Sequence, residues 1–372
     1  MAENQSKRVQ SVEFLRFVGC CIIVYFHVLH HNIIPFTSDS ALYRQLASNA
    51  GEQGVIVEFF LLVSGFFLFR STRDRQQSVA VTVLDKFVRL WPVLLFYSVF
   101  QFLFLDHTVR ASQILDLFFL RCTGISMDFT GIIWYIGPFF WGTLLLAGLQ
   151  KVLDKGKLTL VLALLAYWGY AINLNTTGGE LHREIALEVV SLGFARVIAG
   201  LSLGYLVSSF WDALQCAFVF SMSPRGKTAT ATAVETVLLL FLGIRFFTPR
   251  LAGVTEQSFV YVLLFAILIV SLSTNCSLLS RLCTRFRLGA LGKYAYSIYV
   301  MQQISFDLLK RTLWKNTALV LGHPYPTCIV SVAFSVLVGI AVYFLVERPC
   351  AAAYRRWKQT HLRQTEAGKV TQ

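Results

Sequence analysis

The sequence predicts an all-α integral membrane protein with about ten transmembrane helices. Of its 372 residues, 56% are hydrophobic, and the mean hydropathy is +0.61. Only 14% of the residues are charged, whereas roughly 25% are charged in an ordinary soluble domain. Apolar runs of about 20 residues, the length that crosses a bilayer, recur along the whole chain. These three observations indicate a polytopic membrane protein.

Ten apolar segments have this length. They cover residues 12–34, 54–70, 87–106, 131–150, 157–174, 190–211, 231–248, 256–273, 290–309 and 325–347. The apolar run at 112–121 is shorter, so we interpret it as an interfacial or re-entrant piece. No small-residue cleavage site follows the first segment, which predicts an uncleaved helix and not a signal peptide. We therefore interpret residues 1–348 as one transmembrane domain and 349–372 as a basic cytoplasmic tail.

The positions of lysine and arginine predict that both termini are cytoplasmic. With the N-terminus inside, 22 of the 33 lysines and arginines fall in cytoplasmic segments and nine in outside loops. Arg16 and Arg196 lie within the apolar segments. This asymmetry follows the positive-inside rule. Because the loops account for the net charge of +13, we expect no nucleic-acid partner.

The first segment carries the most informative polar residues. Arg16 and His27 are eleven residues apart, so they share one helix face and lie about 16 Å apart along the axis. Glu13 and His31 fall near the same face. Ionisable residues inside a span usually face the protein interior or a wet cavity. A structural role for His27 alone is as plausible as a functional one, but the shared face with Arg16 favours function.

The second and third segments contain further candidates. Glu58 is an acid one turn inside an apolar run, whereas Ser64 and Gly65 are more typical of helix packing. Lys86 and Arg89 lie one turn apart at the start of the third segment. Such a pair suits a phosphate or pyrophosphate at the inner surface, although topology charges explain the spacing as well.

Later segments add aromatic and acidic candidates. Trp134 and Tyr135 open the fourth segment and are also explained by an aromatic belt. The ninth segment is rich in tyrosine, including Tyr296, and carries paired glutamines. Glu347 ends the tenth segment and is explained as well by pairing with a neighbouring arginine. Pro349 is expected to stop that helix. No HExxH motif or P-loop occurs in the sequence.

These motifs, in this order, resemble the acyltransferase 3 family of membrane-bound acyltransferases. The similarity covers most of the chain. It includes EFLRF (13–17) with His27 eleven residues after Arg16, VEFFLLVSGFFL (57–68), KFVRLWP (86–92), WY (134–135), LGKYAYSIY (291–299) and ERP (347–349). Each motif is weak alone, and their combination is specific.

The resemblance implies acyl transfer, usually of acetyl from acetyl-CoA, to a hydroxyl of an extracytoplasmic or lipid-linked glycan. It implies the stand-alone form, located in a bacterial inner membrane, with acyl-CoA as co-substrate and no permanently bound cofactor. By the same resemblance, His27 is the catalytic base, Arg16 is its partner, and Lys86 and Arg89 hold the donor. The remaining residues expected at the site are Glu13, Glu58, Ser64, Trp134, Tyr135, Tyr296 and Glu347.

The chain departs from the family pattern at three positions. Ala295 and Gln302 stand where the family usually carries Ser and His in the ninth segment, and Lys86 stands where Arg is common. The second catalytic histidine of that segment is therefore in doubt. Lysine at position 86 keeps the charge but loses the bidentate geometry of arginine.

Two other functions remain open on composition. The first is a transporter or flippase of a lipid-linked sugar or acylated intermediate. Transporters often carry internal repeats with interrupted helices, whereas here no repeat is found and the ionisable residues concentrate in the first three segments. The second is a non-catalytic scaffold or sensor, which leaves Arg16, His27 and Glu58 unexplained.

Overall fold

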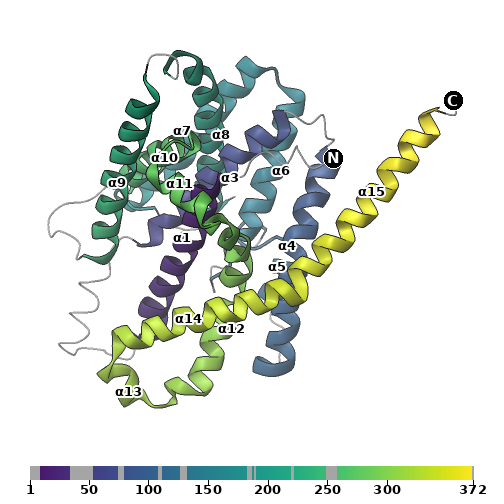
Figure 1. Cartoon of the computed structure of the whole chain (residues 1–372). Helices are drawn as coiled ribbons and strands as arrows, with labels where there is room; N and C mark the ends of the chain where they lie inside the picture. The colour runs from purple at the N-terminus through teal and green to yellow at the C-terminus, as the bar shows by residue number, and fades with distance from the viewer. Residues whose placement is uncertain are drawn as a thin grey trace.

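The computed structural model describes residues 9–33, 53–73, 79–107, 111–125, 132–181, 187, 190–218, 222–248 and 258–370. The regular elements in these residues are all helices (Figure 1). The longer ones are α1 (Gln10–Val28), α3 (Ile56–Arg73), α4 (Val79–Gln101), α6 (Ile136–Val152), α7 (Lys155–Thr177), α8 (Leu192–Phe218), α9 (Pro224–Phe247), α10 (Phe259–Ser273), α12 (Ala295–Arg311), α14 (Pro324–Val342) and α15 (Arg348–Val370).

Shorter helical pieces connect or extend these helices. Those in α or 3₁₀ conformation are η3 (Gln53–Val55), α5 (Ala111–Leu117), α11 (Leu278–Arg285), η5 (Leu288–Tyr294), η6 (Leu313–Lys315) and α13 (Thr317–Gly322). Three π-helical stretches, η1 (Leu29–Ile33), η4 (Phe102–Asp106) and η7 (Tyr343–Glu347), follow α1, α4 and α14.

A multi-pass helical membrane protein is confirmed. Among the described residues, seven helical stretches are long and apolar enough to cross a membrane, or eight if α10 and α11, bent by 62°, form one span. A helix lies at each of the ten predicted segments. Helices α6 and α12, with 17 residues each, are about 26 Å long, slightly less than the roughly 30 Å of a bilayer core.

Helix α1 lies in the middle of the bundle (Figure 1). It packs against α3, α10, α11, α12, α14 and η5. The side chains of Val24 and Val28 are fully buried. The first segment therefore faces protein along much of its length, which agrees with the polar residues that it carries.

The short run predicted at 112–121 folds back into the bundle. It forms α5 and a turn in which the Phe119 ring packs against Phe140 of α6, with ring centroids 4.3 Å apart, and Phe87 of α4, at 6.0 Å. Phe87 precedes the end of α4 at Gln101 by 14 residues, or about 21 Å. The segment thus returns along α4 and does not lie flat at the helix end.

Helices α3 and α8 cross at very close range. A Cβ added at Gly65 would overlap the backbone carbonyl of Leu201, and one added at Gly204 would overlap that of Leu62. Small residues of this kind allow membrane helices to approach each other. Gly65 therefore has the packing role that its sequence context favours.

The expectation that Pro349 ends the last helix is wrong. Helix α14 continues through η7 into α15, and Pro349 is the second residue of α15 (Figure 1). Proline has no N–H to donate, and in a regular α-helix its ring clashes with the carbonyl four residues earlier. The wider π turn before it relieves this constraint, and proline is well tolerated in a first helical turn.

The basic tail is thus a helix, and part of it docks on α4. The Nζ of Lys358 donates to both carboxylate oxygens of Asp85, at 2.7 and 2.9 Å, and the Tyr354 hydroxyl donates to Oδ1 at 2.8 Å. Asp85 directly precedes Lys86, so α15 is anchored next to the basic pair of the third segment.

Candidate functional site

The N-terminal half of α1 holds an arginine–glutamate pair. The Nη1 of Arg16 donates to both carboxylate oxygens of Glu13, at 3.2 and 3.1 Å, one helical turn away. The backbone of η5 covers this carboxylate, because a Cβ added at Gly292 would lie 2.6 Å from Glu13 Oε2. Gly292 belongs to the LGKY motif. The carboxylate of Glu13 is therefore packed against Gly292, and its hydrogen bonds hold the Arg16 guanidinium in place.

Arg16 shares its surroundings with the basic pair of α4. The charges of Arg89 and Arg16 both act on Lys86, whose Nζ lies 5.1 Å from the centroid of the Phe139 ring of α6. The same two arginines act on the Tyr135 hydroxyl. Three basic side chains from two helices thus lie near the start of α6, with Glu13 bonded to Arg16 and the charge of Asp85 acting on Lys86. Such a group of cations can bind an anionic ligand.

Tyr296 and Glu347 complete this region. The Tyr296 hydroxyl donates to the backbone carbonyl of Leu90 at 2.6 Å, which ties α12 to α4. The Ser297 hydroxyl donates to Glu347 Oε2 at 2.6 Å, while the charges of Arg89 and Arg16 also act on this carboxyl. The interpretation that Glu347 simply pairs with an arginine is thus incomplete, because its short hydrogen bond comes from a serine.

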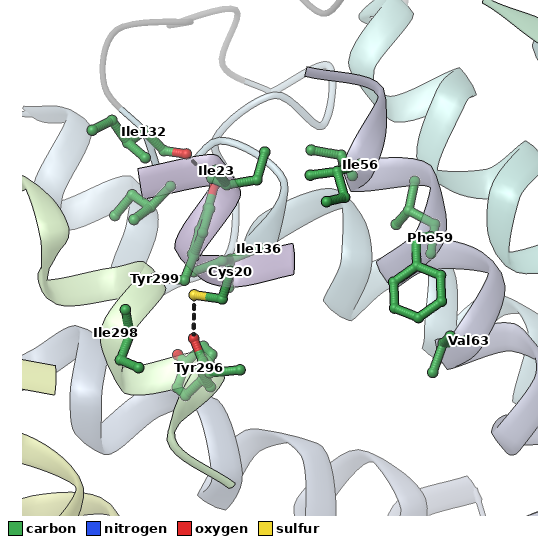
Figure 2. Close-up of a cluster of buried hydrophobic side chains, with 14 of the residues drawn as sticks. Cys20, Ile23, Ile56, Phe59, Val63, Ile132, Ile136, Tyr296, Ile298 and Tyr299 are labelled. Atoms are coloured by element: carbon green, nitrogen blue, oxygen red, sulfur yellow. Dashed lines mark hydrogen bonds between the residues drawn. The ribbon is translucent and has the colours of Figure 1, made fainter. Parts of the chain in front are cut away.

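Further along α1, His27 contacts Gln302 of α12. The distance from His27 Nδ1 to Gln302 Oε1 is 2.9 Å, and both residues are buried. Two turns earlier, the Cys20 thiol donates to the backbone carbonyl of Ala295 at 3.2 Å (Figure 2). Because both contacts join residues 275 positions apart, α1 and α12 run parallel and in register over seven residues.

Two tyrosines lie between the basic cluster and His27. The rings of Tyr135 and Tyr299 meet edge to face, with centroids 4.8 Å apart. The Tyr299 hydroxyl donates to the backbone carbonyl of Ile132, just before α6 (Figure 2). Tyr299 is one turn from both Tyr296 and Gln302 on α12. By the register of α1 and α12, Tyr299 is level with residue 24 of α1, between Arg16 and His27.

Glu58 belongs to a different cluster. Its Oε1 accepts a hydrogen bond from Arg196 Nε at 2.5 Å, and its Oε2 accepts one from the Tyr170 hydroxyl at 2.6 Å. The Arg196 guanidinium also lies 5.8 Å from the Trp134 ring centroid. This ion pair joins α3, α7 and α8, with exposed fractions of 0% for Glu58 and 5% for Arg196.

The opposite face of α3 packs against α1. A Cβ added at Gly19 would lie 3.3 Å from Ile56 and 3.4 Å from Phe60. Ser64 is half-buried on α3, next to the close crossing with α8. The structure therefore gathers Glu13, Arg16, Lys86, Arg89, Tyr135, Tyr296 and Glu347 around the N-terminal part of α1. It places His27 further along that helix and Glu58 and Trp134 at a separate ion pair.

Several contact residues were not among the sequence candidates: Arg196, Tyr170, Ser297, Tyr299 and Gln302. A charged residue inside a span needs a counter-ion, so the position of Arg196 within an apolar segment indicates a buried acidic partner. Gln302 departs from the family pattern, but nothing in the local sequence indicates its contact with His27. Within the described residues, no group of three or more His, Cys, Asp or Glu side chains is arranged to hold a metal ion.

Comparison with known proteins gives one match. A family model for an acyltransferase domain, of the acyltransferase 3 type, matches residues 9–346. No curated protein and no solved structure matches the chain.

Proposed function

This chain belongs to the acyltransferase 3 family, and on that premise we propose that it is a membrane-bound O-acyltransferase. It moves an acyl group, with acetyl as the first candidate, from cytoplasmic acyl-CoA to a hydroxyl of a cell-surface or lipid-linked glycan. We assign it ten spans in a bacterial inner membrane, with both termini in the cytoplasm. The excess of lysine and arginine in the inner segments supports this orientation.

The observation that carries the proposal is the convergence of three cations on the helix that also bears His27. The charges of Arg16 and Arg89 both act on Lys86 and on the Tyr135 hydroxyl. Coenzyme A carries phosphate groups, and arginine and lysine are the side chains that bind phosphate. The basic cluster would hold these phosphates, and the acyl-pantetheine arm would extend along α1 toward His27.

His27 would act as the general base. A neutral imidazole suits this role near pH 7. The acceptor hydroxyl transfers its proton to His27 while its oxygen forms a bond to the thioester carbonyl carbon. When the carbon–sulfur bond breaks, His27 returns the proton to the sulfur, and coenzyme A leaves as the thiol. Arg16, nearer the inner end of α1, would contact the donor.

Replacement of His27 tests this function. We expect His27→Ala to lower the rate of transfer from isotope-labelled acetyl-CoA by about 10²- to 10⁴-fold, the usual contribution of a general base. The matched control is His30→Ala, because His30 lies one turn further along, where its ring packs on Phe26 with centroids 4.3 Å apart. A His27→Ala protein that unfolds at the wild-type temperature and keeps full transfer activity would contradict the mechanism.

Mass spectrometry of surface glycans separates this function from transport. Cells that lack the protein should display the same glycan without the mass of one acyl group. Loss of the entire glycan from the surface, with its precursor retained inside, would instead indicate a transporter or flippase.

A further inference from the structure

We propose that Gln302 is a positioning residue that fixes the ring orientation and the tautomer of His27. As a result, Nε2 of His27 is the nitrogen that removes the proton from the glycan hydroxyl. This inference rests on the proposed function of His27 as a base. It starts from the contact between α1 and α12, where Nδ1 of His27 lies 2.9 Å from Oε1 of Gln302.

The amide of Gln302 has one allowed orientation. Its Nε2 donates to the backbone carbonyl of Tyr299 at 2.8 Å. A carbonyl oxygen only accepts hydrogen bonds, so the group that faces it must be the NH₂ of the amide. The reversed amide would place two acceptors against each other. Oε1 therefore faces His27, and the assignment follows from the hydrogen-bond network.

The orientation of the amide determines the tautomer of the imidazole. Because Oε1 of Gln302 is an acceptor, Nδ1 of His27 must carry a hydrogen to bond with it. In the neutral ring, the lone pair is then on Nε2. A general base needs such a lone pair directed at the proton that it removes. Gln302 thus supplies the function that a carboxylate or carbonyl supplies for other catalytic histidines, without adding a charge.

The partner is itself held rigidly. Gln302 is fully buried, and the Tyr299 residue that receives its NH₂ is anchored by its hydroxyl to Ile132 and by its ring to Tyr135. The parallel register of α1 and α12 keeps residue 302 at the level of His27. A buried amide with both ends bonded in this way has little freedom to reorient.

Nitrogen-15 NMR of histidine-labelled protein in bilayers tests the inference without an activity assay. The chain has seven histidines, and the spectrum of His27→Gln identifies the His27 signals by their absence. We expect the neutral His27 ring to carry its hydrogen on Nδ1. A wild-type ring protonated on Nε2 would overturn the inference, whatever the variants do.

Variants of the two adjacent glutamines provide the second test. Gln302→Leu keeps the approximate volume and removes both hydrogen bonds, so we expect the Nδ1–H tautomer to be lost and transfer to fall about 10- to 100-fold. The control is Gln303→Leu, because Gln303 bonds Asp307 at 3.2 Å and should leave both readouts unchanged. An unchanged His27 spectrum in Gln302→Leu, or equal activity in the two variants, would refute the positioning role.

Gln302→Glu adds a readout that a purely structural role would not change. A carboxylate at this position still accepts from Nδ1–H but also stabilises the imidazolium, which cannot act as a base. The acidic limb of the pH–activity profile should therefore move to higher pH, and an unmoved limb in an active variant would contradict the contact. If the wild type transfers no acyl group but shows the Nδ1–H tautomer, the proposed function fails and the contact itself is upheld.

Discussion

Replacement of Glu58 by glutamine separates a structural role from a role in donor binding. The sequence motif places Glu58 among the expected site residues, whereas the structure pairs it with Arg196 at 2.5 Å and with Tyr170 at 2.6 Å. Glutamine has nearly the same shape: its one amide oxygen can accept from Arg196, and its NH₂ can donate to the Tyr170 hydroxyl. The substitution therefore removes the negative charge and little else.

The expected cost follows from the burial of the pair. Glu58 is fully buried, and Arg196 is 5% exposed. Without the carboxylate, the guanidinium keeps only neutral partners: the amide oxygen of the new glutamine and the backbone carbonyls of Leu181 at 3.3 Å and Gly54 at 3.4 Å. Removal of one partner from a buried ion pair costs about 3–5 kcal/mol, because an uncompensated charge remains. We expect Glu58→Gln to lose about this much free energy of unfolding.

Denaturation of the purified protein in detergent, followed by tryptophan fluorescence, measures this loss. The control is the double variant Glu58→Gln with Arg196→Met, which leaves no buried charge and should recover most of the stability. Wild-type stability of the single variant would refute the reasoning. If that variant also bound acyl-CoA more weakly, Glu58 would be a donor-binding residue instead.

Two further predictions follow from the packing and charge of the bundle. Gly65→Ala should destabilise the protein by about 1–3 kcal/mol in the same denaturation assay, because its Cβ would overlap the Leu201 carbonyl. The control is Gly243→Ala, where no atom lies within 4 Å of the added Cβ. Equal stabilities of the two variants would argue against the close crossing of α3 and α8. Lys86→Gln and Arg89→Gln should each weaken CoA binding about 10-fold or more in calorimetry, as expected for lost charged hydrogen bonds. The control is Lys155→Gln, at an exposed position. Unchanged affinity in the Lys86 and Arg89 variants would show that the pair does not bind the donor.

The sequence was sufficient for the class of fold and for the polar face of the first helix. Apolar run length predicts where helices form, because backbone groups in lipid must be satisfied within the helix. Helical period alone puts Glu13 and Arg16 on one face, one turn apart. Contacts between distant segments have no such signal. Nothing local indicates that Glu58 meets Arg196, 138 residues later.

The error at Pro349 has a related cause. Proline does not always end a helix, although it removes an N–H donor and clashes with the carbonyl four residues earlier; Pro92 also lies inside α4. Here the five residues before Arg348 form a π turn, and this turn packs against α4 and accepts a hydrogen bond from Ser297 through Glu347, contacts that the local sequence does not indicate. Gln302 was visible in the sequence, but its importance depends on the parallel packing of α1 and α12.

The register between α1 and α12 restricts where the gene can gain or lose codons. One residue inserted between Cys20 and His27, or between Ala295 and Gln302, would turn the following part of that helix by about 100°. His27 and Gln302 would then face different neighbours, although length, hydropathy and charge of the chain would hardly change. Matched insertions of whole turns in both helices would be needed to restore the pair. The stretches 20–27 and 295–302 should therefore tolerate no insertions or deletions, even where single substitutions are accepted.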